Sequence, residues 1–331
     1  MSELYPMKFE PILKEKIWGG SSLAENYGKK TGNLKNIGES WEISAVSDNL
    51  SIISNGFLAG NNIEEIIEVY MGDIIGESVF EKFGNEFPLL IKLIEAVDDL
   101  SVQVHPGNEL AKVRHNAYGK TEMWYILQGK KNAKIYTGFS KPVTRDSYVN
   151  AVKNNLVPDL LNIESADPGD TFFTPAGRIH AIGAGIVLAE IQQTSDITYR
   201  IYDWGRKDNK GKSRELHTDL ALEAINFKAA GKNKIKKELP KNIAVNLVTC
   251  EFFDTNIIQF NDHIVRDYNL IDSFVVYICT EGRFLISWEN KSEKISKGET
   301  VLIPAMISDI VLVPEPEATI LEIYINNRGI D

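Results

Sequence analysis

The chain carries one turn-rich pattern twice, and this repeat limits the folds open to it. The segment PGDTFFTPAGRIH of residues 168–180 aligns with KGETVLIPAMISD of residues 297–309, with a glycine and a proline matched in each copy. Each copy lies among short apolar runs bounded by Gly, Pro, Asn and Asp, which is typical of β-strands joined by tight turns. Many short strands of this kind indicate small antiparallel barrels of the jelly-roll or cupin type. The sequence therefore predicts a mainly β protein with two cupin-like (jelly-roll) barrels and a few flanking helices.

The repeat also suggests how the chain divides. We expect residues 1–236 to form a catalytic, metal-binding cupin domain with helical additions, and residues 237–331 a C-terminal cupin-like barrel without metal ligands. The polar and basic segment GKNKIKKELPKN, residues 231–242, is the predicted linker. A chain of 331 residues with 43% apolar composition can bury two moderate cores.

Local patterns predict individual elements inside this framework. Apolar residues at helical spacing predict helices over 61–70 behind Asn62, over 144–156, and over 217–227 behind the cap Thr218. The bounded apolar run of residues 89–98 predicts a buried strand. Alternation over residues 122–140, with turn residues at Gln128, Gly129 and Gly138, predicts a β-hairpin.

One predicted strand collects polar side chains on one face. Ser101, Gln103 and His105 alternate with two valines, so the three polar groups share a side. Glu122 opens the apolar run MWYIL, and the turn-rich segment near the first repeat delivers His180. One amide, two imidazoles and one carboxylate suit an open catalytic zinc site. Gln-x-His is by itself a weak motif, so ordinary surface or core histidines are the alternative.

The internal repeat offers a comparison within the chain. The alignment that matches the two copies places Asp309 at the position of His180. Aligning MWYILQG with VVYICTEG places either Phe274 or Val275 at the position of Glu122. The second barrel is therefore predicted to lack the ligands, and the barrel does not need them to fold. Function explains their presence in the first barrel more readily than stability does.

Four segments together resemble a known family. SVQVHP, GKTEMWYIL, PAGRIHAIGAG and TSDITYRIYDWGR, in this order, are similar to the type I mannose-6-phosphate isomerases in their short bacterial form, and the similarity begins at KIWGG. The resemblance implies interconversion of mannose 6-phosphate and fructose 6-phosphate by zinc-assisted proton transfer through an enediolate. It also implies one Zn²⁺ per chain, held at the four matching positions Gln103, His105, Glu122 and His180.

The resemblance also suggests catalytic residues. Arg200 matches the family's catalytic arginine, and we interpret it as a fixed positive charge because arginine is always protonated. A salt bridge from Arg200 to Asp203 or Glu190 is the alternative. Lys120, Glu190 and Asp196 are the candidates for moving the proton, and the sequence does not choose among them.

Substrate recognition is expected to depend on hydrogen-bond donors. Lys92 lies in the middle of a buried strand, where a lysine needs a partner, so it points either into the pocket or out to solvent along its stem. Ser101 and Lys92 are the predicted substrate-binding residues, with help from Arg200 or Lys120. Trp18 and Trp41 are expected in the core rather than at the edge of the site.

Composition excludes several classes of function. The formal net charge is −10 and the pI about 5.2, with no block of Lys or Arg, so nucleic acid is not an expected partner. The N-terminus lacks an apolar signal region and no run is long enough to span a membrane. We therefore expect a cytoplasmic protein with no membrane partner. We further expect a monomer, and the resemblance implies that its partner is a small sugar phosphate. Cys250 and Cys279 are expected as free thiols, and His115 and His263 receive no role.

Other functions remain open at this point. The same site could isomerise another sugar phosphate or a free sugar, or the protein could be a regulatory cupin that binds sugar without catalysis. An iron oxygenase would use a similar His/His/carboxylate set. The chain also lacks room for the helical insertion of the long eukaryotic members, which leaves its substrate range open.

Overall fold

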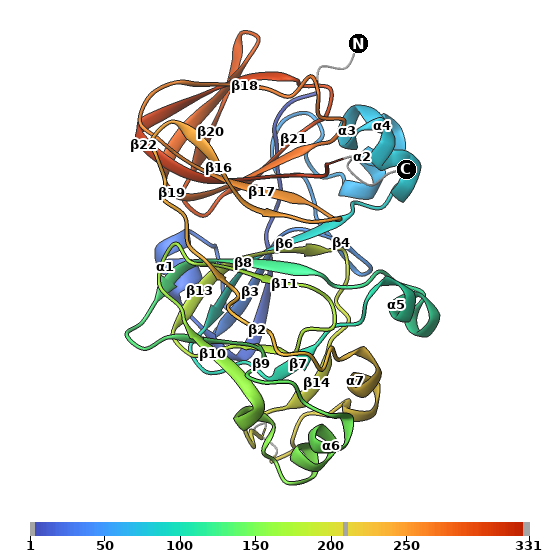
Figure 1. The fold of residues 1–331 in the computed structure, drawn as a ribbon. Helices are drawn as coiled ribbons and strands as arrows, with labels where there is room; N and C mark the ends of the chain where they lie inside the picture. Colours follow the sequence, from blue (N-terminus) through green and yellow to red (C-terminus); the bar gives the residue numbers. More distant parts are fainter. Residues whose placement is uncertain (1–3, 208–210, 327–331) are drawn as a thin grey trace.

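The structure is a computed structural model that describes residues 4–207 and 211–326 of the chain. Two β-barrels lie one above the other, with helices beside each (Figure 1). The protein is mainly β and contains two cupin-type barrels, as predicted. Within the described residues no helix is both long and apolar enough to cross a membrane.

The first barrel consists of two antiparallel sheets that face each other. The seven-stranded sheet runs in the order β15 (Lys234–Ile235), β11 (Thr171–Thr174), β8 (Glu122–Gly129), β13 (Ile186–Gln193), β6 (Leu89–Ala96), β3 (Ile37–Ile43) and β2 (Ile12–Gly20). The five-stranded sheet runs β10 (Leu161–Ser165), β9 (Lys134–Phe139), β12 (His180–Ile182), β7 (Val102–Val104) and β14 (Tyr199–Tyr202). The functional groups lie between these sheets.

The second barrel recruits a strand from the start of the chain. Its sheet runs β1 (Met7–Lys8), β21 (Thr300–Ile303), β19 (Val275–Trp288), β22 (Asp309–Tyr324), β17 (Asp254–Phe260) and β16 (Ile243–Thr249), with β18 (Ile264–Asp267) on β22 and β20 (Lys291–Ser296) on β19. Strand β1 pairs with β21, although the predicted division assigns it to the first domain. That division stays a prediction, and its ends, residues 1–3 and 327–331, lie outside the described residues.

The register of the paired strands shows which residue of the second barrel corresponds to Glu122, which the sequence alignment left undecided. In the first barrel Thr174 pairs with Glu122, and in the second barrel the equivalent Ile303 pairs with Val275. Val275, rather than Phe274, therefore occupies the position of Glu122. Within the described residues, the first barrel holds the only cluster of at least three His, Cys, Asp or Glu side chains close enough to share a metal ion.

Three helices pack beside the second barrel: α2 (Ile63–Tyr70), α3 (Gly72–Ile75) and α4 (Glu77–Phe83). Helix α2 begins as predicted, because Asn62 accepts a hydrogen bond from the Glu65 N–H while the Glu65 carboxylate accepts from the Asn62 N–H. Its apolar face, including Ile63, Ile66 and Ile67, is buried. The sequence thus located this helix correctly at its start and on its buried face.

Four more helices lie around the first barrel: α1 (Ser22–Tyr27), α5 (Asn108–His115), α6 (Arg145–Lys153) and α7 (Thr218–Ala224). The predicted helix over 144–156 exists as α6, with Thr144 at its N-cap, but it ends at Lys153. The predicted cap of α7 is wrong by one residue, because His217 holds the N-cap position and Thr218 is already helical. Part of the predicted linker is not free chain, since β15 pairs with β11.

The predicted hairpin over residues 122–140 is wrong. Strands β8 and β9 both exist, but β8 pairs with β11 and β13, whereas β9 pairs with β10 and β12. Because both edges of β8 are taken by strands from later in the chain, β9 crosses to the opposite sheet. The turn between them joins the two sheets of the barrel rather than two neighbours in one sheet.

A continuous apolar core connects the two barrels. It includes Leu89, Ile91 and Met123 from the first barrel together with Tyr277 and Ile320 from the second. Burial of this shared surface ties the position of β6 and β8, which carry site residues, to the second barrel. Of the two free cysteines, Cys279 is buried and Cys250 is partly buried.

Candidate active site and metal ligands

A row of polar side chains crosses the five-stranded sheet. Gln103 on β7 pairs with His180 on β12 and with Arg200 on β14. Residues that pair directly across strands point to the same face of a sheet, so these three side chains share the inner face of the barrel. Ser101 and His105 flank Gln103 on the same face, while Val102 and Val104 are buried on the other. The predicted alternation is confirmed.

A second row faces it from the seven-stranded sheet. Lys92 on β6 pairs with Trp41 on β3 and with Glu190 on β13, and Glu190 pairs with Trp124 on β8. All four side chains are buried. The alternative in which Lys92 reaches out to solvent is therefore wrong.

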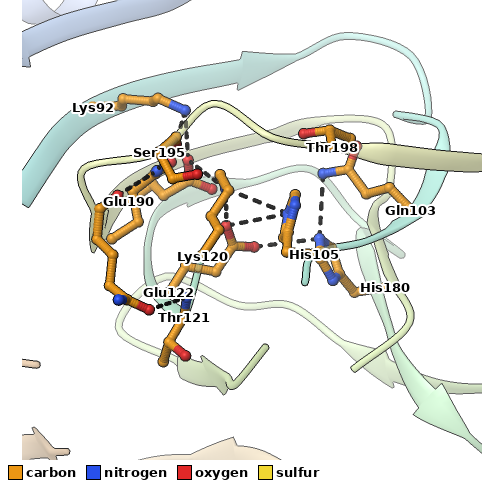
Figure 2. Close-up of polar contacts among 12 residues, drawn as sticks. Lys92, Gln103, His105, Lys120, Thr121, Glu122, His180, Glu190, Ser195 and Thr198 are labelled. Carbon is orange, nitrogen blue, oxygen red and sulfur yellow. Dashed lines mark hydrogen bonds and ion pairs between the residues drawn. The ribbon is translucent and has the colours of Figure 1, made fainter. Parts of the chain in front are cut away.

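Three side chains converge between the two rows (Figure 2). Glu122 Oε2 lies 3.5 Å from His105 Nε2, and Glu122 Oε1 lies 3.3 Å from His180 Nε2. One ligand atom from each residue falls within 4.8 Å of the others, and all three residues are buried. Gln103 adds an amide whose Nε2 lies 3.2 Å from His180 Nε2. The structure thus brings together the four residues predicted as metal ligands.

Backbone carbonyls orient both imidazoles. His105 Nδ1 lies 2.8 Å from the carbonyl of Ile197, and His180 Nδ1 lies 2.9 Å from the carbonyl of Arg178. A carbonyl can only accept, so each Nδ1 carries the proton and each Nε2 presents its lone pair to the cluster. Burial lowers the pKa of His105 well below its usual value and that of His180 to about 3. Both rings are therefore neutral, as metal binding requires.

Among the residues that the structure describes, Glu122 supplies the only carboxylate in direct contact with both rings. Burial raises its pKa to about 7, against the lowering effect of Lys120. Its Oε1 has no hydrogen-bond partner among the described residues and faces the lone pair of His180 Nε2. Two buried acceptors at this distance need a proton or a cation between them. The donor set of two neutral imidazoles, a carboxylate and an amide therefore fits a divalent metal ion.

Two lysines and one glutamate form a network beside the ligands. The Lys120 ammonium forms an ion pair with Glu122 and lies 3.3 Å from His105 Nε2 and 3.8 Å from Glu190. Glu190 accepts hydrogen bonds from Lys92 at 3.0 Å and from the Trp124 indole at 2.8 Å. Burial opposes the charge on Glu190, but Lys120 and Lys92 outweigh it and lower its pKa to about 2.

A cavity of about 420 Å³ opens above this network. The predicted residues Ser101, Asp196 and Arg200 line it, as do Lys92, Lys120, Gln103 and Glu190. Sequence reasoning did not single out several other lining residues, namely Lys14, Lys16, Asn49, Thr198 and Arg214. Of these, Lys16 and Thr198 carried a signal, because Lys16 begins KIWGG and Thr198 lies within TSDITYRIYDWGR. Trp18 and Trp41 are buried, as expected, but both also line the cavity.

Arg200 does not form either of the salt bridges considered for it. Its Nη1 donates to the Glu215 carbonyl at 2.9 Å, and within the described residues no carboxylate lies in ion-pair distance of it. Asp203 instead binds Arg206 and Arg214. The Arg200 guanidinium thus remains available at the cavity wall.

Comparisons with known proteins agree with this geometry. Residues 7–140 match the model of the phosphomannose isomerase type I catalytic domain. The chain is 36% identical over 310 residues to mannose-6-phosphate isomerase ManA of Bacillus subtilis, covering 93% of this chain and 95% of that protein. It is 31% identical over 307 residues to the mannose-6-phosphate isomerase of Streptococcus mutans, covering 91% and 93%.

A solved structure extends the likeness to three dimensions. The crystal structure of the mannose 6-phosphate isomerase from Bacillus subtilis superposes with a TM-score of 0.84 at 29% identity, over 97% of this chain and 99% of that one. Sequence and fold therefore agree over nearly the whole length of both barrels. The chain belongs to the type I phosphomannose isomerase family of aldose–ketose isomerases.

Proposed function

We propose that this protein interconverts mannose 6-phosphate and fructose 6-phosphate with one Zn²⁺ held by Gln103, His105, Glu122 and His180. The observation that carries the proposal is the buried Glu122 carboxylate between two imidazoles whose Nε2 lone pairs point at it. The names of its relatives supply the substrate. When bound, Zn²⁺ would act as a Lewis acid that stabilises negative charge on the sugar oxygens.

The reaction moves a proton between C1 and C2 of the open-chain sugar through an enediolate, so a residue must remove and return that proton. Glu190 is poorly suited, because its carboxylate is held by Lys92 and Trp124 and its lowered pKa makes it a weak base. Lys120 and Asp196 both face the cavity and remain the candidates. We assign Glu190 the task of holding the two lysines in place.

The negative charge of the substrate also requires positively charged or hydrogen-bond-donating groups in the site. Lys92 is engaged by Glu190 and by Gln192 at 2.8 Å, so its ammonium contributes a fixed positive charge rather than a free donor. Ser101 and Arg200 line the open cavity, and Arg200 keeps an unpartnered Nε within the described residues. We infer that Arg200 stabilises negative charge that develops on the substrate.

Proton exchange at C2 tests the proposal. The zinc-loaded protein is incubated with mannose 6-phosphate in heavy water, and ¹H NMR follows the C2 proton and the appearance of fructose 6-phosphate. We expect both exchange and product. Binding without exchange would support a regulatory sugar-binding protein, and exchange only with other sugar phosphates or free sugars would assign a different substrate. Metal analysis of the purified protein separates zinc from iron.

A further inference from the structure

Two guanidinium groups beside the cavity share one carboxylate, and a third lies close by without binding it. Asp203 is only 7% exposed, and it accepts from Arg206 Nε at 3.1 Å and Nη2 at 2.7 Å. It also accepts from Arg214 Nε at 2.8 Å and from Arg214 Nη2. Arg200 is the third cation, and its Nε is buried without a partner among the described residues. The exposed Asp98 lies 3.7 Å from Arg206. The side that faces the cavity therefore keeps an excess of positive charge.

Backbone pairing places Arg214 beside Arg200. The His217 N–H donates to the Arg200 carbonyl at 2.7 Å, and the Arg200 N–H donates to His217 Nδ1 at 3.1 Å. The Arg200 side chain donates in turn to the carbonyl of Glu215. Residues 214–217 thus run along β14, and Arg214 enters the cavity wall next to Arg200. Burial lowers the pKa of Arg200, and Arg214 is the largest contributor among the neighbouring charges.

Asp203 binds only some of the N–H groups of Arg214. A guanidinium carries five N–H groups in a fixed fork. Asp203 takes the Nε proton and one proton of Nη2, and within the described residues no partner binds Nη1. The Arg214 side chain is 29% exposed, so the free donors can reach a ligand in the cavity. Such a fork suits two oxygens of a phosphate group.

The distance from the metal ligands fits a sugar phosphate. His180, Gln103 and Arg200 lie on three consecutive strands of one sheet, so the backbones of Arg200 and His180 are about 10 Å apart along that sheet. Both backbone groups of Arg200 bond to His217, at the edge of β14 that faces away from β7, so residues 214–217 lie beyond Arg200 from the metal ligands. An open-chain hexose 6-phosphate carries its reacting carbons and its phosphate at opposite ends. A phosphate at Arg214 would therefore leave C1 and C2 near the ligand cluster.

We propose that Arg214 binds the substrate phosphate and selects phosphorylated over neutral sugars, and that Asp203 is the positioning residue that holds its guanidinium. The inference rests on the proposed function, because it concerns the substrate of the same site. The lysines that line the cavity are less suited to this task. Lys92 and Lys120 are held by buried carboxylates. Lys16 is paired with Glu39, and Lys14 donates to the Asn49 side chain.

Steady-state kinetics of the zinc-loaded full chain test the role of Arg214. For Arg214→Gln we expect KM for mannose 6-phosphate to rise about 10- to 100-fold, with kcat changed less than about threefold, because a charge-assisted contact to the phosphate is lost. Inhibition by inorganic phosphate should weaken in parallel, whereas kcat/KM for neutral mannose should not change. For Arg214→Lys we expect a KM for mannose 6-phosphate between those of wild type and Arg214→Gln, since lysine keeps the charge but lacks the guanidinium fork. Arg283→Gln, which removes a 58% exposed arginine paired with Glu315, is the control and should change nothing.

Asp203→Asn tests the positioning role. We expect the same rise in KM for mannose 6-phosphate with kcat largely kept, and no change in kcat/KM for neutral mannose. A purely structural role would instead lower the thermal midpoint and affect both sugars alike. An unchanged KM in Arg214→Gln would overturn the inference and leave the proposed function intact. If the wild type does not isomerise mannose 6-phosphate, the role of Arg214 is tested by calorimetric titration with inorganic phosphate. Weaker binding by Arg214→Gln than by wild type supports the inference, and equal affinity overturns it.

Discussion

At the scale of single residues, two backbone carbonyls determine the chemistry of the histidines. The carbonyls of Ile197 and Arg178 hold the protons of His105 and His180 on Nδ1. Burial keeps both rings neutral, so their lone pairs are available at Nε2. Glu122 completes the set between them. Orientation by groups outside the ligand set is a general feature of metal sites, and here the main chain provides it.

Removing either histidine should abolish metal binding and activity without unfolding the barrel. For His105→Ala and for His180→Ala we expect metal affinity to fall by at least about 100-fold, because one of few ligands is lost. Equilibrium dialysis with Zn²⁺ and the C2 exchange assay measure the two effects, and circular dichroism checks the fold. His263→Ala, at an exposed loop position, should retain both properties. Unfolding of both ligand variants would show that the site is structural.

At the scale of elements, sequence patterns predicted helices and strands correctly where the contacts that stabilise them are local. The α2 start was predictable because its cap residues Asn62 and Glu65 are three positions apart. The hairpin over 122–140 failed because the partners of β8 come from much later in the chain. Alternation identifies a strand and its faces, but it does not say which strand will lie beside it.

Loss of the α2 cap should weaken the protein without affecting catalysis. We expect Asn62→Ala to lower the free energy of unfolding by about 1 kcal/mol, because the Glu65 N–H loses its acceptor at the helix start. Urea denaturation measures the change. Glu68→Ala, at an exposed position of the same helix, should change the free energy by less than about 0.5 kcal/mol. Equal losses in the two variants would argue against a specific capping effect.

At the scale of the whole molecule, polar contacts connect the N-terminal part of the chain to the second barrel. Lys29 donates to Glu42 on β3 of the first barrel and to the Gly298 carbonyl in the second, both at 2.6 Å. Asp272, which precedes β19, accepts from the N–H groups of Glu77 and Ser78 at the start of α4, at 2.7 and 2.9 Å. Together with the shared apolar core, these contacts indicate that the barrels are stable as a pair.

Breaking the buried lysine contact should be costly. Lys29→Met leaves the Glu42 carboxylate buried without its counter-charge, so we expect the free energy of unfolding to fall by about 3–5 kcal/mol. Lys241→Met removes an exposed lysine paired with Glu317 and should cost about 0–1 kcal/mol. Denaturant titrations of the two variants give the comparison. A loss in Lys29→Met no larger than in the control would show that the contact contributes little.

The Asp272 contact should make stability depend on pH. Burial opposes its charge, but hydrogen bonds from Ser78 and Glu77 outweigh burial and lower the pKa of Asp272 below the usual 3.8. A carboxyl with a lowered pKa stabilises the folded state above its unfolded pKa, and this contribution is lost as pH falls through the folded pKa. Asp272→Asn should therefore be less stable than wild type at pH 6, with the gap narrowing below about pH 4. A gap of constant size in urea unfolding would contradict this account.

The sequence by itself determined the local features of this protein. Alternation and turn residues specified the strands, the polar face of β7 and the repeat, and the resemblance led to the four candidate ligands. Each of these signals is contained in a short stretch of chain. Tertiary structure alone decided that β8 and β9 lie in opposite sheets, that Val275 replaces Glu122 in the second barrel, and that Arg214 lies beside Arg200. Strand partners and converging charges depend on contacts between segments far apart in sequence, and no local pattern encodes which segments will meet.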